Sequence, residues 1–246
     1  MSCSHVTTVL LAGGFGTRIK HLLSELPKPL APVADRPFLD WVIRFLAQQG
    51  ISNVILSTGY QGQMIADHYA NHPVERVNVS CRHEAQPMGT AGGFLNALAG
   101  QRSPSANWLV GNGDSLVLAD LGKFCASLAQ RDCAAGILGV RMDDAGRYGT
   151  IKANEQGLLE AFHEKRPGAG LINAGVYFFR DDAVSLFPKK PVLSFETDVF
   201  PHLLAKGVRI GVYETNAPFI DIGTPDTLGA ATAFIQTHRN HFGPTS

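Results

Sequence analysis

Short apolar runs alternate with amphipathic segments along the first part of the chain, and turn residues separate them. Continuous apolar and β-branched runs are typical of buried strands, whereas apolar residues three and four positions apart are typical of helices. The pattern predicts strands at 6–11, 53–58, 77–81, 107–110 and 134–140, and helices at 38–46, 61–69, 94–98 and 121–130. Strands and helices that alternate in this way form a parallel sheet with helices on both faces, so we predict an α/β fold.

The pattern changes near Asp143. Residues 147–152 and 158–163 are typical of an antiparallel hairpin, and an apolar strand is predicted at 171–179, a helix at 194–204, a strand at 208–213 and a last helix at 226–235. Thr224 and Pro225 are suited to begin that last helix. We therefore expect one domain over 1–246, with a larger part at about 1–142, a small antiparallel part at about 143–236 and a loosely held polar tail at 237–246.

Composition and charge exclude several classes of partner. The 21 Lys and Arg residues balance 21 Asp and Glu residues, so the broad basic surface that nucleic-acid binding needs is not expected. No apolar run has the length of a membrane span and the first residues do not have the pattern of a secretion signal, so we expect a cytoplasmic protein without a membrane partner. The sequence leaves open whether the chain forms a homo-oligomer.

Neither the cysteines nor the histidines form a typical metal motif. The four cysteines show no C-x-x-C spacing and lie in or beside apolar runs, so buried, inert thiols are expected. His68 and His72 have a spacing that zinc uses on a helix, but no third ligand completes the set.

A glycine-rich loop follows the first predicted strand. The run Ala12-Gly13-Gly14-Phe15-Gly16-Thr17-Arg18 has glycines at three of four successive positions, which lets backbone N–H groups point at one anion without hindrance from Cβ atoms. Arg18 adds a permanent charge, and Lys28 between two prolines adds a second. The loop therefore predicts a polyphosphate site. It is not a P-loop, because no Lys-Ser or Lys-Thr follows, and a dinucleotide fingerprint would need glycine where Ile19 stands.

Further polar residues follow later strands. Gln86, in the loop 84–93, could pair with the edge of a base, and Gly89 allows close backbone approach, although a plain connecting loop would look similar. Asp114, after the strand at 107–110, is a candidate Mg²⁺ ligand, with an Asx turn or helix cap as the alternative. Asp221 between two isoleucines and Asn173 within an apolar strand both need polar partners.

Taken in order, these segments resemble the sugar-phosphate nucleotidyltransferase family from Val9 to Pro225. The matching motifs are G-G-x-G-T-R with Pro-Lys-Pro, Q-P-x-G-T-A, N-G-D, Y-G, E-K, N-A-G and D-I-G-T. The resemblance implies a nucleotide-diphospho-sugar transferase fold, a Rossmann-like sheet with a small antiparallel sugar-binding part. It also implies a Mg²⁺-dependent transfer of a nucleotidyl group from a nucleoside triphosphate to a sugar 1-phosphate, with release of pyrophosphate.

Within that family the chain looks most like the D-glycero-α-D-manno-heptose 1-phosphate guanylyltransferases, which supply GDP-heptose for bacterial surface polysaccharide. GTP and the heptose phosphate are therefore the favoured pair. Mannose, glucose or N-acetylmuramate 1-phosphate with GTP, TTP or UTP are alternatives. An alternative of another class is a non-catalytic nucleotide-sensing subunit.

The resemblance implies a role for each matching residue. It makes Arg18, Lys28, Asp114 and Asp221 catalytic, and makes the two aspartates the metal ligands. It assigns nucleotide binding to Ala12, Gly13, Gly14, Gly16, Thr17, Gln86, Gly89 and Thr90, and sugar-phosphate binding to Tyr148, Gly149, Glu164, Lys165 and Asn173. From the residues alone, Glu164 and Lys165 would be taken for a solvated ion pair. Because the attacking phosphate is already ionised near neutral pH, no general base is needed.

Overall fold

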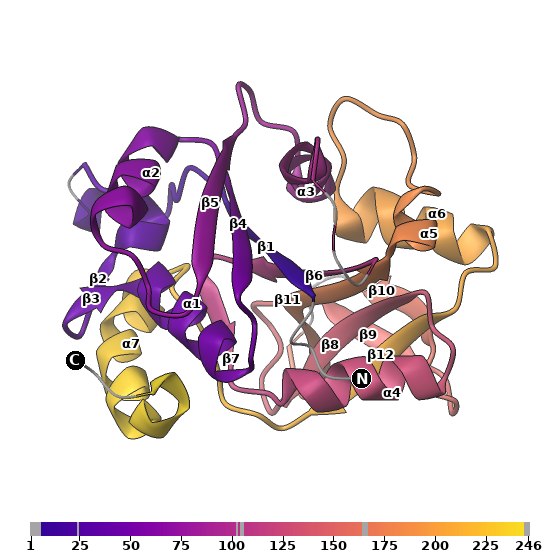
Figure 1. The fold of residues 1–246 in the computed structure, drawn as a ribbon. Coiled ribbons are helices and arrows are strands. Elements are labelled where there is room, and N and C mark those ends of the chain that lie inside the picture. The colour runs from indigo at the N-terminus through magenta and orange to yellow at the C-terminus, as the bar shows by residue number, and fades with distance from the viewer. Residues whose placement is uncertain (1–5, 24, 102, 104–105, 164–166, 244–246) are drawn as a thin grey trace.

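The computed structural model describes residues 6–23, 25–101, 103, 106–163 and 167–243. Four strands form the parallel part of its main sheet: β1 (Thr7–Ala12), β4 (Asn53–Thr58), β5 (Asn78–His83) and β6 (Asn107–Asn112). β1 lies between β6 and β4, and β5 pairs with the other edge of β4 (Figure 1). Because all four run in the same direction, the loops that follow them gather at one edge of the sheet.

The antiparallel strands continue this sheet instead of forming a separate one. They are β8 (Ala135–Met142), β9 (Thr150–Ala153), β10 (Leu159–His163) and the long β11 (Gly170–Arg180), joined by β12 (Ile210–Thr215). β11 runs antiparallel to β6, with Val176 opposite Gly111, and the described residues give a nine-stranded sheet. The strand predicted at 134–140 was expected to close the first part of the chain, but β8 pairs with β11 and β12.

Helices cover both faces of the sheet, as predicted. α1 (Phe38–Gln48), α2 (Gly62–Asn71), α4 (Leu121–Gln130) and α7 (Pro225–Thr237) lie on one face, and α3 (Thr90–Leu98), α5 (Asp181–Val184) and α6 (Phe200–Ala205) lie on the other (Figure 1). Successive side chains of a strand point to opposite faces of the sheet. Val9 belongs to the apolar cluster that contains Phe94 of α3, and Leu10 belongs to the cluster on the other face, which contains Phe45 of α1. The predicted α/β fold class is therefore confirmed.

Short elements complete the chain. β7 (Ser115–Val117) pairs antiparallel with β13 (Phe219–Asp221), and β2 (Pro32–Val33) pairs with β3 (Arg36–Pro37). The segments Lys20–Leu22, Lys28–Leu30 and Arg239–Phe242 are 3₁₀ turns, and Phe195–Val199 is a π-helical turn before α6. In the β7–β13 pair Asp221 lies opposite Ser115, which brings it beside the strand end that carries Asp114.

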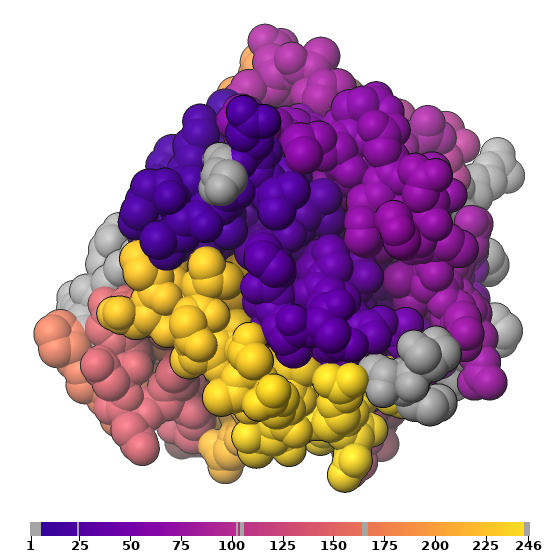
Figure 2. Space-filling view, turned by 90° about the vertical axis from the view of Figure 1, so that its left-hand side faces the viewer, coloured from indigo at the N-terminus to yellow at the C-terminus, as the bar shows by residue number. Residues whose placement is uncertain are grey.

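The end of the described chain differs from the loosely held tail that was expected. Arg239–Phe242 forms a helical turn, and the Phe242 side chain is buried with its ring centre 5.1 Å from that of Trp41. One apolar side chain therefore anchors a segment whose other residues are polar. Figure 2 shows the C-terminal segment in yellow against the N-terminal segment in indigo, and the Ala34 N–H donates to Thr232 Oγ1 of α7 at 3.0 Å.

Helix ends follow the sequence signals only in part. α7 begins as predicted, with Pro225 in its first turn and Thr224 Oγ1 accepting a hydrogen bond from the Thr227 N–H. α3 begins at Thr90, four residues before the predicted start at Phe94, because its glycines lie within the helix. Within the described residues, no helix combines the length and the apolar character that a membrane crossing requires.

Candidate active site

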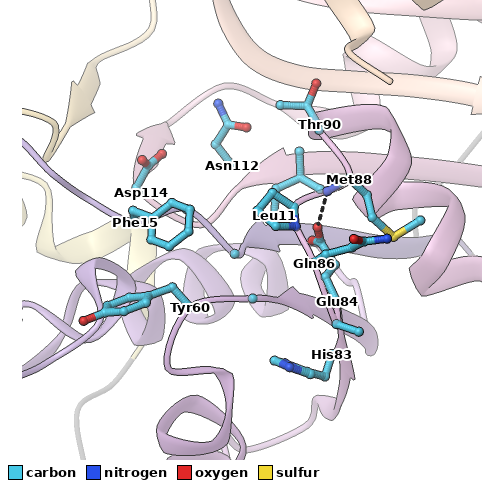
Figure 3. A pocket seen from close by; sticks show the side chains of 16 residues that line it. Leu11, Phe15, Tyr60, His83, Glu84, Gln86, Met88, Thr90, Asn112 and Asp114 are labelled. Carbon is cyan, nitrogen blue, oxygen red and sulfur yellow. Dashed lines mark hydrogen bonds between the residues drawn. The ribbon is translucent and has the colours of Figure 1, made fainter. Parts of the chain in front are cut away.

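The loops at the carboxyl ends of the parallel strands line a cavity of about 600 Å³, which we call the glycine-loop cavity (Figure 3). One wall is the glycine-rich loop after β1, and the opposite wall is the loop that joins β5 to α3. The floor is formed by the ends of β1 and β6. The lining residues are Leu11, Gly13, Gly14, Phe15, Gly59, Tyr60, 83–90, Asn112 and Asp114. Open sheets of this type bind ligands at such an edge.

The glycine-rich loop leaves Gly14 and Phe15 accessible at the wall of this cavity. Phe15 is 54% exposed, and its ring centre lies 5.4 Å from that of Tyr60. The Ala12 side chain is buried in the core, so only its backbone could serve a ligand. Gly16 packs against the side chain of Lys28: a Cβ atom at 16 would lie 2.9 Å from Lys28 Cβ. The loop therefore presents backbone groups to the cavity at Gly13 and Gly14, and at Gly16 it packs against the Lys28 side chain.

Glu84 fixes the opposite wall. Its carboxylate accepts hydrogen bonds from Ser57 Oγ at 2.9 Å and from the Met88 N–H at 3.3 Å, the second of which is drawn in Figure 3. Gln86 lies on the loop that these bonds hold, and it lines the cavity. Gly89 has φ +77°, and a Cβ atom there would lie 2.5 Å from the Leu193 carbonyl oxygen. The close approach expected at Gly89 is therefore made to Leu193.

The N-terminus of α3 is occupied by the chain itself. The Leu193 carbonyl accepts hydrogen bonds from the N–H groups of Ala91 (2.8 Å) and Gly92 (3.1 Å). Thr90 Oγ1 accepts another from the Phe195 N–H at 3.0 Å. The N–H groups of Ala91 and Gly92 are the donors that would otherwise attract an anion at the start of this helix. A phosphate is therefore expected at the glycine-rich loop and not at α3.

Lys28 and the two predicted metal-binding aspartates share a second hollow, the central cavity, of about 580 Å³. Lys28 Nζ lies 2.6 Å from Asp114 Oδ2, with the lysine side chain 14% exposed and the aspartate side chain 37% exposed. A Cβ atom at Gly223 would lie 2.6 Å from Asp221 Oδ1 and 3.6 Å from Lys28 Nζ, so the ammonium group lies close to both aspartates. Arg18 lines the same cavity and is exposed.

Asp221 is held by groups from three directions. The Tyr148 hydroxyl donates to Asp221 Oδ2, Arg147 Nη2 lies 3.3 Å from the same oxygen, and the Gly223 N–H donates to Oδ1 at 2.7 Å. Burial, followed by the hydrogen bond to Asp221, raises the pKa of Tyr148 well above its ordinary value. Tyr148 therefore stays a hydrogen-bond donor to this carboxylate across the neutral range. These contacts supply the partners that an aspartate between two isoleucines needs.

A third hollow, the β11 cavity of about 670 Å³, lies against the middle of β11. Asn173 Nδ2 donates to the Tyr177 hydroxyl at 2.9 Å, and that hydroxyl donates to Glu196 Oε1 at 2.8 Å. Ser194 Oγ donates to the other Glu196 oxygen at 2.9 Å. Burial, together with the nearby Glu196 carboxylate, raises the pKa of Tyr177 well above its ordinary value. The polar partners predicted for Asn173 are thus protein groups, and one of them, Glu196, lines this cavity together with Glu160.

The donor set around Asp114 and Asp221 suits Mg²⁺. Two carboxylates on neighbouring segments line one cavity, with Lys28 and Arg147 compensating their charge. The described residues contain no group of three or more histidine, cysteine, aspartate or glutamate side chains placed to hold a metal ion. Mg²⁺ does not require one, because it commonly keeps several waters and takes one or two carboxylates together with substrate phosphates.

The structure brings most of the predicted site residues to these three cavities. The glycine-loop cavity takes Gly13, Gly14, Gln86, Gly89 and Thr90; the central cavity takes Arg18, Lys28, Asp114 and Asp221; Tyr148 and Asn173 line the central and β11 cavities; and Gly149 lines the β11 cavity. Ala12, Gly16 and Thr17 do not line them. Glu164 and Lys165 lie outside the described residues.

The predicted set omits several polar and charged residues that line these cavities. Among them are Glu84, Asn112, Arg147 and Glu196. Asn112 and Arg147 stand within two residues of predicted ones, so the flanking motif could have indicated them. Glu196 lies in the π-helical turn that Ser194 caps, and its contacts with Tyr177 and Asn173 of β11 depend on tertiary packing that no local motif indicates.

The two histidines with zinc-like spacing and the three cysteines that the structure describes do not line the three cavities. His68 Nε2 lies 3.2 Å from Asp40 Oδ1 and the His68 ring stacks on that of His72. Cys125 and Cys133 are buried, and Cys81 is half-buried. Burial raises the pKa of the Cys81 and Cys133 thiols, as expected of unreactive cysteines.

Comparisons with known proteins agree with this geometry. The family model described as nucleotidyl transferase matches residues 7–238. A D-glycero-alpha-D-manno-heptose 1-phosphate guanylyltransferase of Aneurinibacillus thermoaerophilus is 33% identical over 229 residues, which cover 93% of this chain and 97% of that protein. A mannose-1-phosphate guanylyltransferase of Mycobacterium tuberculosis is 33% identical over 236 residues, covering 95% of this chain but 65% of that protein.

A solved structure shares the fold over nearly the whole chain. The crystal structure of HddC from Yersinia pseudotuberculosis complexed with GMP-PN superimposes with a TM-score of 0.83 at 32% identity, covering 94% of this chain and 99% of that one.

Proposed function

Because this chain belongs to the nucleotidyl transferase family, we propose that it transfers the guanylyl group of GTP to a sugar 1-phosphate and releases pyrophosphate. D-glycero-α-D-manno-heptose 1-phosphate is the favoured acceptor. The observation that carries the proposal is the junction of the three cavities, where Asp114 and Lys28 lie between the glycine-rich loop and β11.

The choice of acceptor rests on the extent of the relatives. The heptose enzyme of Aneurinibacillus thermoaerophilus matches this chain over 97% of its own length, whereas the mannose enzyme of Mycobacterium tuberculosis matches over 65% of its length at the same identity. The guanine base is supported by the names of both relatives and by the GMP-PN complex of HddC. Cytoplasm, where GTP is available, is the compartment that this reaction suggests.

We assign the two substrates to opposite ends of the site. The glycine-loop cavity takes GTP, with its base against the loop 84–89 and its phosphates toward Gly14 and Arg18. The β11 cavity takes the sugar, with Asn173 and Glu196 facing its hydroxyl groups. This arrangement corresponds to a nucleotide-binding part at about 1–142 and a sugar-binding part at about 143–236.

The chemical step needs two anions to approach each other. An oxygen of the sugar phosphate attacks the α-phosphorus of GTP, and the bond from that phosphorus to the departing pyrophosphate breaks. Two unit charges 4 Å apart repel by about 4 kcal/mol at an effective dielectric constant near 20, so positive charge at the junction lowers the barrier. Lys28 is fixed there by Asp114, and Arg147 by Asp221. Arg18 lines the same cavity, and we assign it to the departing phosphates.

The metal ion assigned to this reaction is Mg²⁺, with Asp114 and Asp221 as its ligands. When bound, the ion would neutralise phosphate charge at the junction. Lys28 and the Tyr148 hydroxyl would meanwhile keep the two carboxylates oriented. No side chain has to remove a proton, because the attacking phosphate is already an anion; catalysis then depends on position and charge.

The proposal is tested by measuring pyrophosphate release across a matrix of triphosphates (GTP, ATP, UTP, TTP) and sugar 1-phosphates (heptose, mannose, glucose, N-acetylmuramate), with Mg²⁺. Release that is fastest with GTP and the heptose phosphate is expected. Release with a different pair would keep the reaction class and change the substrate. The absence of pyrophosphate release with every pair would favour the non-catalytic nucleotide-sensing alternative.

A further inference from the structure

We propose that the side-chain amide of Asn112 is a substrate-binding group that donates a hydrogen bond to the phosphate of the sugar 1-phosphate. This inference rests on the proposed function for the identity of the ligand. Its basis is position: among the described residues, Asn112 alone lines the glycine-loop, central and β11 cavities. A group at that junction can touch the sugar phosphate where it meets the nucleotide.

The strand directs this side chain into the site. Asn112 is the last residue of β6, and the alternate residues before it, Trp108 and Val110, pack in the core on the α3 face of the sheet. Asn112 continues that alternation past the end of the core. It is half-buried, and no side-chain hydrogen bond of Asn112 is present within the described residues. Figure 3 shows its amide at the cavity wall together with Asp114. A half-buried amide without a protein partner is suited to bind a ligand.

The neighbouring strand is shaped to leave room for it. β11 pairs with β6 up to Val176 opposite Gly111, so the next position would bring Gly175 opposite Asn112. There the pairing of β11 with β8 shifts register between Asn173 and Val176, and Gly175 adopts φ +71°. A Cβ atom at 175 would lie 2.2 Å from Asn112 Nδ2. The irregularity in β11 therefore clears the space that the amide occupies, as strand bulges beside active sites often do.

The two asparagines at this junction differ in their partners. Asn173 is fixed on three sides: its Nδ2 donates to Tyr177 and lies 3.5 Å from a Glu196 oxygen, and its Oδ1 accepts from the Gly175 N–H at 3.0 Å. Asn112 lies beside Gly175, and its Nδ2 donates no hydrogen bond to any residue that the structure describes. The chain thus uses one amide to hold the irregular strand and presents the other to the cavities.

An amide is the chemically suitable donor at this point. The junction already holds the carboxylates of Asp114 and Asp221, balanced by Lys28 and Arg147. A neutral N–H can approach a phosphate oxygen there without adding charge, whereas a carboxylate at 112 would repel the phosphate. Asn112→Asp has nearly the same shape, loses the donor and adds a negative charge, so it separates this role from simple packing.

The test compares Asn112→Ala and Asn112→Asp with wild type and with Asn78→Ala, an exposed asparagine at the start of β5. Steady-state pyrophosphate release gives kcat and KM for each substrate, and calorimetry gives the Kd of GTP alone with Mg²⁺. We expect kcat/KM for the sugar phosphate to fall about 10- to 100-fold in Asn112→Ala, as for a lost hydrogen bond to a charged group, and further in Asn112→Asp. The Kd of GTP should change less than about 3-fold, and Asn78→Ala should match wild type.

The possible failures are distinguishable. If wild type is active and both Asn112 variants keep kcat/KM for the sugar phosphate within about 3-fold, the inference is wrong while the proposed function stands. If the Kd of GTP rises by the same factor by which kcat/KM for the sugar phosphate falls, the site is generally distorted and the inference is also wrong. A wild type without activity toward any pair would overturn the proposed function first. Thermal unfolding of each variant shows whether a loss comes from misfolding.

Discussion

At the scale of single residues, the site is a set of charges that the fold holds close together. Lys28 contacts Asp114 at 2.6 Å, and Arg147 and Tyr148 contact Asp221. The described structure therefore balances each of the two acidic side chains with a cation before any ligand is bound. A substrate that brings several negative charges would enter a site whose positive groups are already oriented.

Asp114→Asn and Asp221→Asn test the proposed metal ligands. Each change keeps the shape and removes the charge that a divalent cation needs, so we expect kcat to fall about 10²- to 10³-fold or more, with the fold retained. Turnover at saturating Mg²⁺ is the measurement, with circular dichroism for the fold. Asp143→Asn, at an exposed position near the site segment, is the matched control. Full activity in both site variants would refute the assignment.

Tyr148 gives a prediction about pH. Burial and the hydrogen bond to Asp221 raise its pKa in the folded chain above the value of about 10 that an unfolded tyrosine has. The stability from this hydroxyl is therefore fully present below pH 10 and is lost as the pH rises through the folded pKa. In urea unfolding, the stability advantage of wild type over Tyr148→Phe should be the same at pH 8.5 and pH 9 and should shrink as the pH rises from about 10 to about 11. An advantage that grows with pH would contradict this.

At the scale of elements, β11 connects the core with the site. Its residues from Val176 onward pair regularly with β6, and the irregular stretch between Asn173 and Val176 lies beside Asn112. This one strand therefore both completes the sheet and shapes the junction of the cavities.

Gly175→Ala should destabilise the fold more than Gly207→Ala. Both glycines have a similar φ, +71° and +74°, so both variants lose about 1–2 kcal/mol from the left-handed conformation. A methyl group at 175 would also meet Asn112 Nδ2 at 2.2 Å, whereas nothing lies within 4 Å of one at 207. We expect a further 1–3 kcal/mol at 175 from this overlap. Equal free energies of unfolding would show that the space beside Asn112 is not tightly defined.

The sequence predicted the elements whose signals are local. The alternating strands and helices, the cap at Thr224 and the loop of glycines all depend on neighbours in the chain, and the structure has them. The sequence did not predict that β8 pairs with β11 and β12 and not with the parallel strands β1, β4, β5 and β6, because strand order depends on pairing between distant segments. Glu196 and the anchoring of Phe242 were missed for the same reason: their partners Tyr177 and Trp41 are far away in sequence.

At the scale of the whole molecule, the glycine-loop cavity and the β11 cavity open from two halves of one continuous sheet, so filling them should stabilise the chain as a unit. For a ligand that binds only the folded state, a free concentration of 100 times Kd raises the free energy of unfolding by about 2.7 kcal/mol. We expect that increase with GTP and Mg²⁺, measured by chemical unfolding. ATP at the same concentration is the control, and an equal effect of ATP would contradict guanine selectivity.

The most direct measurement is ³¹P NMR of one reaction mixture that contains the wild-type chain, GTP, D-glycero-α-D-manno-heptose 1-phosphate and Mg²⁺. Attack of the sugar phosphate on the α-phosphorus predicts that a nucleoside diphosphate sugar and pyrophosphate appear in equal concentrations, while the resonance of the sugar phosphate declines. If GTP is instead converted to GDP and inorganic phosphate with the sugar phosphate unchanged, or if no resonance changes, the chain is not the sugar 1-phosphate guanylyltransferase proposed here.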